Sequence, residues 1–177
     1  VANVLPPTVS LIVSNGAIER GLDGTTYARR LLPRDVARRV LGSTLDHRHA
    51  TALIFDRDAD GQLMHESMDW EHPGRKGYWA RNRSFIGQSV PLEDALVEDP
   101  IQVMFNGPVV GMRELRDALA PSAEGFAVSL TEYVDRDFSL VDITAPEATK
   151  GRAVAWRARQ LGLTRDQVMA IGDNFND

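Results

Sequence analysis

The sequence predicts an α/β protein that carries an inserted α+β domain, on three observations. The apolar run Val168–Ile171 leads through a glycine into D-N-F-N-D, which is typical of a buried strand ending in a ligand-binding loop. The β-branched stretch Thr8–Ser14 predicts a second interior strand. The long stretch between them contains strands and helices in α+β order. We therefore expect the two ends of the chain to form one domain and the middle to form another.

Composition narrows the class of protein. The 177 residues are 43% hydrophobic and 25% charged, as in a soluble globular protein with one good core or two small ones. The net charge of −5 argues against nucleic acid as the main partner. The sequence has no cysteine, which excludes disulfides and cysteine zinc sites and fits a cytoplasmic location. We see no membrane span and no signal peptide. The composition says nothing about oligomeric state.

The first third of the chain reads as follows. The opening strand ends at the turn Asn15-Gly16. Two short extended pieces flank Gly21–Gly24 and predict a hairpin over 19–32. A helix begins at Pro33, because proline suits the first helical position and apolar residues follow at helical spacing. A strand over 50–55 and a return strand over 62–68 flank an acidic turn.

The middle of the chain is less regular. Residues 69–90 show little periodicity but hold aromatic residues beside arginines and a histidine. We interpret these aromatics as cover for a small core, with a substrate-facing role as the alternative. A short helix over 92–97, a strand over 101–105 and a helix striped by Met112, Leu115 and Leu119 follow. Strands over 126–130 and 138–143 complete this part.

The last part predicts a helix over Thr149–Leu161 and then the final strand. Val154, Ala158 and Leu161 form the expected inward face, and Gly162 closes the helix. Thr164 and Gln167 form a capping box before the strand.

The acidic end of the chain predicts a cation site. Asp173, Asn174, Asn176 and Asp177 present carboxylate and amide oxygens, which suit a hard cation such as Mg²⁺. The alternative is an ordinary polar turn, because Asp, Asn and Gly are common turn residues.

Three motifs, in order, resemble those of the haloacid dehalogenase-like (HAD) superfamily, specifically the Cof-type phosphatases. They are L-I-V-S-N-G-A-I-E from Leu11 to Glu19, a lysine at the start of the penultimate helix (Lys150), and the terminal G-D-N-F-N-D. The resemblance implies a partial HAD-like Rossmannoid core with an inserted α+β cap. Residues 1–18 and 141–177 would be core, and residues 19–140 would be the cap.

The resemblance also implies a function. It suggests a Mg²⁺-dependent phosphatase that hydrolyses a phosphorylated sugar or similar small metabolite through an aspartyl-phosphate. Lys150 and Asn176 would be catalytic, and Asn15, Lys150 and Asn176 would bind the substrate. Asp173 and Asp177 would bind the metal ion.

The family's nucleophile motif, D-x-D-G-T after a strand, does not occur in residues 1–177. The similar G-L-D-G-T has Gly21 at the nucleophile position and reads as a hairpin turn. Asp56-Arg57-Asp58 follows a strand, but it lacks the G-T and falls in the cap. We therefore expect these 177 residues to be inactive alone and the nucleophile to lie before Val1. Two alternatives stay open: a non-catalytic module that binds phosphate or sugar phosphate, and a relative specific for one phosphorylated sugar.

Overall fold

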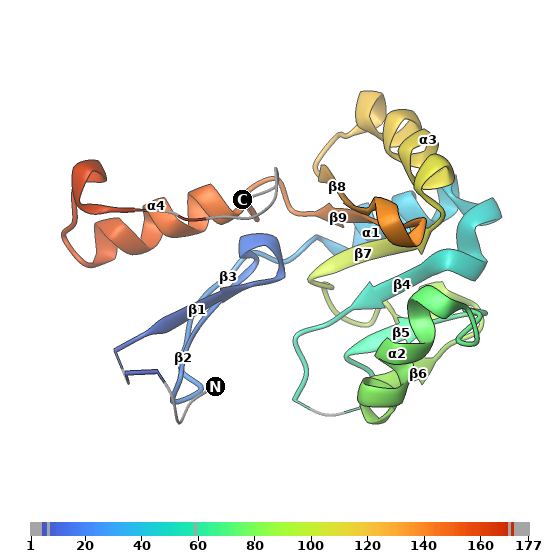
Figure 1. The fold of residues 1–177 in the computed structure, drawn as a ribbon, viewed down its shortest axis with the longest axis horizontal. Helices are drawn as coiled ribbons and strands as arrows, with labels where there is room; N and C mark the ends of the chain where they lie inside the picture. Colours follow the sequence, from blue (N-terminus) through green and yellow to red (C-terminus); the bar gives the residue numbers. More distant parts are fainter. Residues whose placement is uncertain (1–4, 7, 59, 170, 172–177) are drawn as a thin grey trace.

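The computed structural model describes residues 5–6, 8–58, 60–169 and 171. These residues form two β-sheets, in which most neighbouring strands are antiparallel, and four α-helices (Figure 1). The smaller sheet has three strands in the order β1-β2-β3 and the larger has six in the order β6-β5-β4-β7-β9-β8. The mixed α/β fold predicted from the sequence is confirmed. None of the helices in the described part of the chain has the length and apolar character needed to span a bilayer.

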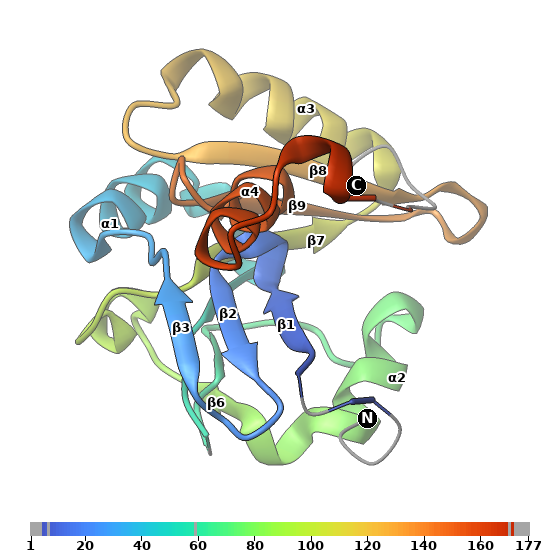
Figure 2. The ribbon, with the colours of Figure 1, turned by 90° about the vertical axis from the view of Figure 1, so that its left-hand side faces the viewer.

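The three-stranded sheet is built from the first thirty residues. β1 (Ser10–Val13) pairs antiparallel with β2 (Ile18–Gly21), and β2 pairs with β3 (Thr26–Arg29). The predicted hairpin is therefore confirmed, although it joins β1 and not the larger sheet. Helix α4 (Lys150–Gln160) lies next to this sheet, so an early and a late segment of the chain pack together (Figures 1 and 2).

The six-stranded sheet forms the body of the middle region. Its strands are antiparallel to their neighbours except for the parallel pair of β5 and β6. Their bounds are Thr51–Ile54 (β4), Leu63–His65 (β5), Ile86–Gln88 (β6), Gln102–Gly107 (β7), Ala127–Tyr133 (β8) and Phe138–Thr144 (β9). The strands predicted over 50–55, 62–68, 101–105, 126–130 and 138–143 are all present, within a few residues.

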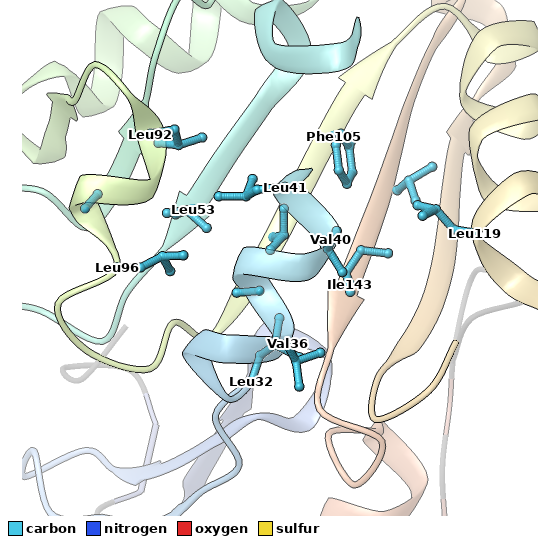
Figure 3. Packing of buried hydrophobic residues seen from close by; sticks show 14 of the residues in the cluster. Leu32, Val36, Val40, Leu41, Leu53, Leu92, Leu96, Phe105, Leu119 and Ile143 are labelled. Carbon is cyan, nitrogen blue, oxygen red and sulfur yellow. The ribbon is translucent and has the colours of Figure 1, made fainter. Parts of the chain in front are cut away.

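Two helices cover one face of the larger sheet. The apolar stripes of α1 (Arg34–Ser43) and α3 (Val109–Leu119) pack on inward residues of β4, β7 and β9. Leu41, Leu53 and Phe105 are completely buried at the centre of this cluster (Figure 3). Removing this much apolar surface from water is the main stabilising contribution to this half of the molecule. Both helices agree with the predictions, because their apolar stripes are clear in the sequence.

Helix α2 (Pro73–Asn82) was not predicted, and it lies on the opposite face of the sheet (Figure 1). It contains Gly74 and Gly77, and Arg75 is its only buried residue, so it has no apolar stripe to detect. Its start does carry a signal: Pro73 occupies the first turn, and the His72 side chain accepts a hydrogen bond from the Gly74 N–H. This helix creates the second wall of the cavity described below.

Short 3-10 turns connect many of these elements. The predicted helix over 92–97 is one of them, spanning Leu92–Ala95. The others are Ser14–Gly16, Leu45–Ala50, Arg83–Phe85, Ala120–Ser122, Val134–Arg136 and Arg165–Gln167.

Candidate functional site

The turn that carries Asn15 has an unusual backbone. Asn15 adopts the left-handed conformation (φ 56°, ψ 22°), and Gly16 follows with φ 94°. Asparagine tolerates this conformation better than most residues, and glycine adopts it without steric cost. The predicted Asn-Gly turn is therefore confirmed. It turns the chain from β1 into β2 and presents the Asn15 side chain towards β9, where it meets Asp142.

Gly16 brings this turn against the start of α4, although the two segments are more than 130 residues apart in sequence. A Cβ atom added at Gly16 would overlap the carbonyl group of Thr149 and lie 3.0 Å from the backbone nitrogen of Lys150. Only glycine therefore fits at this contact. The structure thus places the turn of Asn15 beside the helix end that carries Lys150, two of the segments singled out by the sequence.

Helix α4 begins where the sequence predicted. Thr149 is its N-cap, with Oγ1 accepting a hydrogen bond from the Arg152 N–H at 3.2 Å, and Lys150 is its first residue. The amide groups and dipole of a helix N-terminus favour an anion, and the Lys150 ammonium adds a full positive charge. This end of α4 is therefore electrostatically suited to a phosphate group.

The far end of α4 and its packing face differ in how well they were predicted. Gly162 has φ 68°, and the Leu163 N–H bonds back to the Ala158 carbonyl, so the glycine stop is confirmed. The predicted inward face is wrong at two of its three residues: Val154 and Leu161 are 37% and 56% exposed, whereas Ala158 is half-buried. The buried residue of the helix is Ala153. The helix packs through small and charged side chains, which hydrophobic periodicity does not detect.

Asp142 on β9 was missed by the sequence reasoning and stands at the centre of the site. Its side chain accepts hydrogen bonds from Asn15 Nδ2 at 3.1 Å and from Gln102 Nε2 at 2.8 Å. Burial raises the pKa of Asp142 to about 6, against the opposing effect of the Asn15 hydrogen bond. A lone acid within the apolar strand S-L-V-D-I-T was the available signal. Asp142 links the larger sheet to the Asn15 turn.

The remaining predicted site residues, Asp173, Asn176 and Asp177, lie outside the described residues. Within the described part of the chain, no group of three or more His, Asp or Glu side chains is arranged to hold a metal ion. The assignment of Asp173 and Asp177 as metal ligands therefore stays a prediction.

The buried strand predicted over 168–171 is not observed. Residues 168, 169 and 171 have no strand pairing, and Met169 and Ile171 are 83% and 87% exposed. Neither of the two sheets in the described part of the chain pairs with this segment. The capping box before it is confirmed, with Gln167 Oε1 accepting from the Thr164 N–H at 2.9 Å.

The two aspartate motifs set aside in the sequence have structural roles. In the turn between β2 and β3, the N–H and hydroxyl of Thr25 both donate to Asp23 and hold its pKa below the usual value. Asp56 accepts from Arg20 at 2.8 Å and from Arg29 at 2.7 Å. Burial raises the pKa of Asp56, but the two guanidinium groups outweigh burial and hold it below the usual value. Asp56 thus joins the two sheets.

Comparisons with known proteins agree on the fold. The sequence model for haloacid dehalogenase-like hydrolases matches residues 1–177. No curated protein matches the chain. One similar solved structure is a haloacid dehalogenase-like hydrolase from Bacteroides thetaiotaomicron (TM-score 0.71, 19% identity, covering 95% of this chain and 60% of that chain). Another is a haloacid dehalogenase-like hydrolase from B. subtilis (TM-score 0.74, 14% identity, covering 96% and 64%).

A third similar structure comes from a study of phosphatases of the haloalkanoate (HAD) enzyme superfamily, again from Bacteroides thetaiotaomicron. It has a TM-score of 0.70 and 16% identity, and the match covers 97% of this chain and 58% of that chain. The chain therefore spans about three fifths of the length of these structures. At these identities the likeness shows the fold alone.

Proposed function

Because the chain belongs to the haloacid dehalogenase-like hydrolase family, we propose that the full-length protein is a Mg²⁺-dependent, Cof-type phosphatase. Its substrate would be a phosphorylated sugar or a similar small metabolite. We also propose a cytoplasmic location, on the absence of cysteine. The six-stranded sheet with its helices would be the cap, and β1–β3 with α4 would belong to the core. The pairing of β2 and β3 with β1 supports a first boundary between core and cap after Arg29, and not after residue 18 as the sequence suggested.

One observation carries this proposal: the contact of Gly16 with Thr149 and Lys150. Through this contact the N-terminus of α4, with the backbone of Lys150, lies against the Asn15 turn, although the two segments are far apart in sequence. Phosphoryl transfer relies mainly on positioning and on stabilising negative charge, and these groups are suited to both tasks. In the proposed reaction Lys150 offsets charge on the phosphoryl group, and Asn15 orients the substrate.

The other roles follow the family resemblance. Asn176 would contact Lys150 or the phosphate, and Asp173 and Asp177 would hold Mg²⁺, which polarises phosphoryl oxygens when bound. The covalent step needs an aspartate nucleophile, and the family's nucleophile motif is absent from residues 1–177. The proposal therefore concerns the full-length protein.

The test is a phosphate-release assay on the full-length protein with a panel of phosphomonoesters, in Mg²⁺ and in EDTA. We expect release that depends on Mg²⁺ and falls about 100-fold or more in Lys150→Ala, because a charge that stabilises the transition state is lost. The chain has one other lysine, Lys76, whose exposed side chain pairs with Glu71 at 2.9 Å. Lys76→Ala is the matched control and should keep full activity.

Two results would contradict the proposal. Equal loss in both lysine variants would remove Lys150 from the site. Binding of phosphomonoesters without any release would favour the alternative, a non-catalytic module that binds phosphate or sugar phosphate.

A further inference from the structure

A cavity of about 760 Å³ lies between α2 and the face of the six-stranded sheet that α1 and α3 leave open. Alternate residues of β7 (Gln102, Met104 and Asn106) form its floor, because their side chains point away from the buried core. Cavities of this size hold small organic molecules in many proteins. The cavity is therefore a candidate for ligand binding in its own right.

The charge of the cavity is opposite to that of the chain. Counted over the described residues, its lining includes three arginines and no carboxylate, although the chain has 25 acidic and 20 basic residues. Arg75 is not available to a ligand, because its guanidinium donates to the side chain and carbonyl of Asn106 and to the Asp69 carbonyl. Arg81 and Arg136 are exposed and have no ion-pair partner within the described part of the chain. They are suited to bind an acidic group.

The position of Arg81 supports this role. Arg81 Nη1 lies 3.5 Å from the point where a Cβ of Gly77 would stand, so its side chain folds back along α2 towards Gly77. Arg136 reaches the same cavity from the turn between β8 and β9. The carboxylate next to it, Asp137, is occupied in accepting the Val109 N–H at 3.0 Å. Two guanidinium groups from different elements thus line the same cavity.

The other walls are aromatic. Trp70, Tyr78, Tyr133 and Phe138 line the cavity. Trp70 is fixed by a 3.1 Å hydrogen bond from its Nε1 to His65 and by stacking on Trp79 with ring centroids 5.1 Å apart. Rigid aromatic rings give an organic group apolar contact at little cost in conformational entropy. From the sequence, we interpret these aromatic residues as cover for a small core. Trp70 does pack on a small apolar cluster, and it lines the cavity as well.

The cavity adjoins the candidate site through one side chain. Gln102 lines the cavity and also donates to Asp142, which in turn accepts from Asn15. A substrate held at both places would therefore lie along Gln102.

We propose that this cavity receives the alcohol part of the substrate and that this part carries a second acidic group, which Arg81 and Arg136 bind. The substrate class is then a phosphomonoester with an additional phosphate or carboxylate. This inference rests on the proposed phosphatase function.

The kinetic test compares substrates that differ only in the second acid. The pairs are hexose 1,6-bisphosphate with hexose 6-phosphate, and 3-phosphoglycerate with glycerol 3-phosphate, on the full-length protein. We expect the more acidic member of at least one pair to have a kcat/KM at least ~10-fold higher, because charge-assisted hydrogen bonds are strong. Arg81→Gln and Arg136→Gln should each remove most of that preference through KM, with a smaller effect on the less acidic substrate than on the more acidic one. Arg83→Gln, at an exposed arginine outside the cavity, is the control.

A binding measurement separates this inference from the proposed function. Calorimetry with hexose 1,6-bisphosphate and 3-phosphoglycerate needs no turnover. Binding that weakens ~10-fold in the Arg81 and Arg136 variants, but not in Arg83→Gln, supports binding of the acidic group in the cavity, even if no ester is hydrolysed. No preference for the second acid in either pair, or equal effects of all three arginine variants, would overturn it.

A cavity-filling variant checks the location independently. A Cβ at Gly77 meets only Arg81 within 4 Å, so Gly77→Phe should fold while it occupies the cavity. We expect it to weaken binding of the acidic ligands at least ~10-fold. The control is Gly42→Phe on α1, where an added Cβ meets nothing within 4 Å. Unchanged binding in Gly77→Phe would place the ligand elsewhere.

Discussion

Gly16 is the residue on which the geometry of the candidate site depends most directly. Its positive φ and its contact with the backbone of Thr149 are two separate reasons for glycine at this position. The positive φ belongs to the turn, and the dipeptide Asn15-Gly16 predicts it from the sequence. The second depends on the approach of α4, which no local pattern reveals.

We predict that Gly16→Ala destabilises the protein by about 2–4 kcal/mol, because strain at a positive φ adds to a backbone overlap that cannot be relieved by a side-chain movement. Gly24→Ala is the matched control: Gly24 has φ 88°, but an added Cβ would meet nothing within 4 Å. It should cost only about 1 kcal/mol. Urea unfolding of both variants measures the difference. Equal losses would mean that the contact with α4 contributes nothing.

Asp142 is the second residue whose environment has a measurable consequence. Its pKa of about 6 in the folded protein lies above the ordinary value of 3.8, so the folded state holds this proton more tightly than the unfolded state. The contribution of this group to stability is therefore greatest below pH 4, falls as the pH rises towards 6 and is level above that. The size of the effect is roughly 3 kcal/mol.

We predict that Asp142→Asn removes this pH dependence. Asparagine imitates the protonated acid, and the amides of Asn15 and Gln102 can each turn to present an oxygen or a nitrogen to it. Relative to the wild type, the variant should therefore gain roughly 2–3 kcal/mol in free energy of unfolding between pH 4 and pH 7. Urea unfolding at both pH values measures this, with the exposed Asp135→Asn as the control. A difference between variant and wild type that does not change with pH would refute it.

At the scale of elements, α4 and β2 are joined by a buried charge pair. Glu19 is fully buried, and its Oε1 lies 3.2 Å from Arg157 Nε. The two atoms satisfy the distance of an ion pair but not the angles of a hydrogen bond, so the attraction is mainly between charges. Arg157 also stacks on the Tyr27 ring, 4.5 Å from its centre. This pair explains how α4 packs without a large apolar face.

We predict that Arg157→Met destabilises the protein by about 3–5 kcal/mol, because it leaves the Glu19 carboxylate buried without an opposite charge. The double variant Glu19→Gln/Arg157→Met should recover most of this loss, since a buried ion pair contributes little net stability. Arg39→Met is the control, because the exposed i,i+4 pair of Arg39 with Asp35 should matter by less than about 0.5 kcal/mol. A double variant as unstable as the sum of the single variants would contradict this account.

Elements also differ in how well local pattern predicts them. The stripes of α1 and α3 and the strands of the larger sheet follow from periodicity, because each buries an apolar face in the common core. Helix α2 and the packing face of α4 do not, because the buried residue is an arginine in α2 and an alanine in α4. The segment over 168–171 is the reverse case, an apolar run that stays exposed because neither described sheet pairs with it.

At the scale of the whole molecule, a few contacts hold the two sheets together. A small apolar cluster that includes Ile18 and Ile101 lies between them, and Asp56 and Asp142 accept hydrogen bonds across the same boundary. Buried polar links of this kind fix a relative orientation more than they add stability. The candidate site lies along this boundary, and Gln102 links it to the arginine-lined cavity on the larger sheet.

The sequence by itself determined the α/β class, the helix that starts at Lys150, the Asn15-Gly16 turn and the family motifs, because each depends on residues close together in the chain. The tertiary structure alone decided that Gly16 lies against Thr149, that Asp142 joins Asn15 to Gln102, and that Arg81 and Arg136 open onto one cavity. These features depend on the packing of segments far apart in sequence. Such contacts are set by the shape of the whole fold, which local periodicity does not contain.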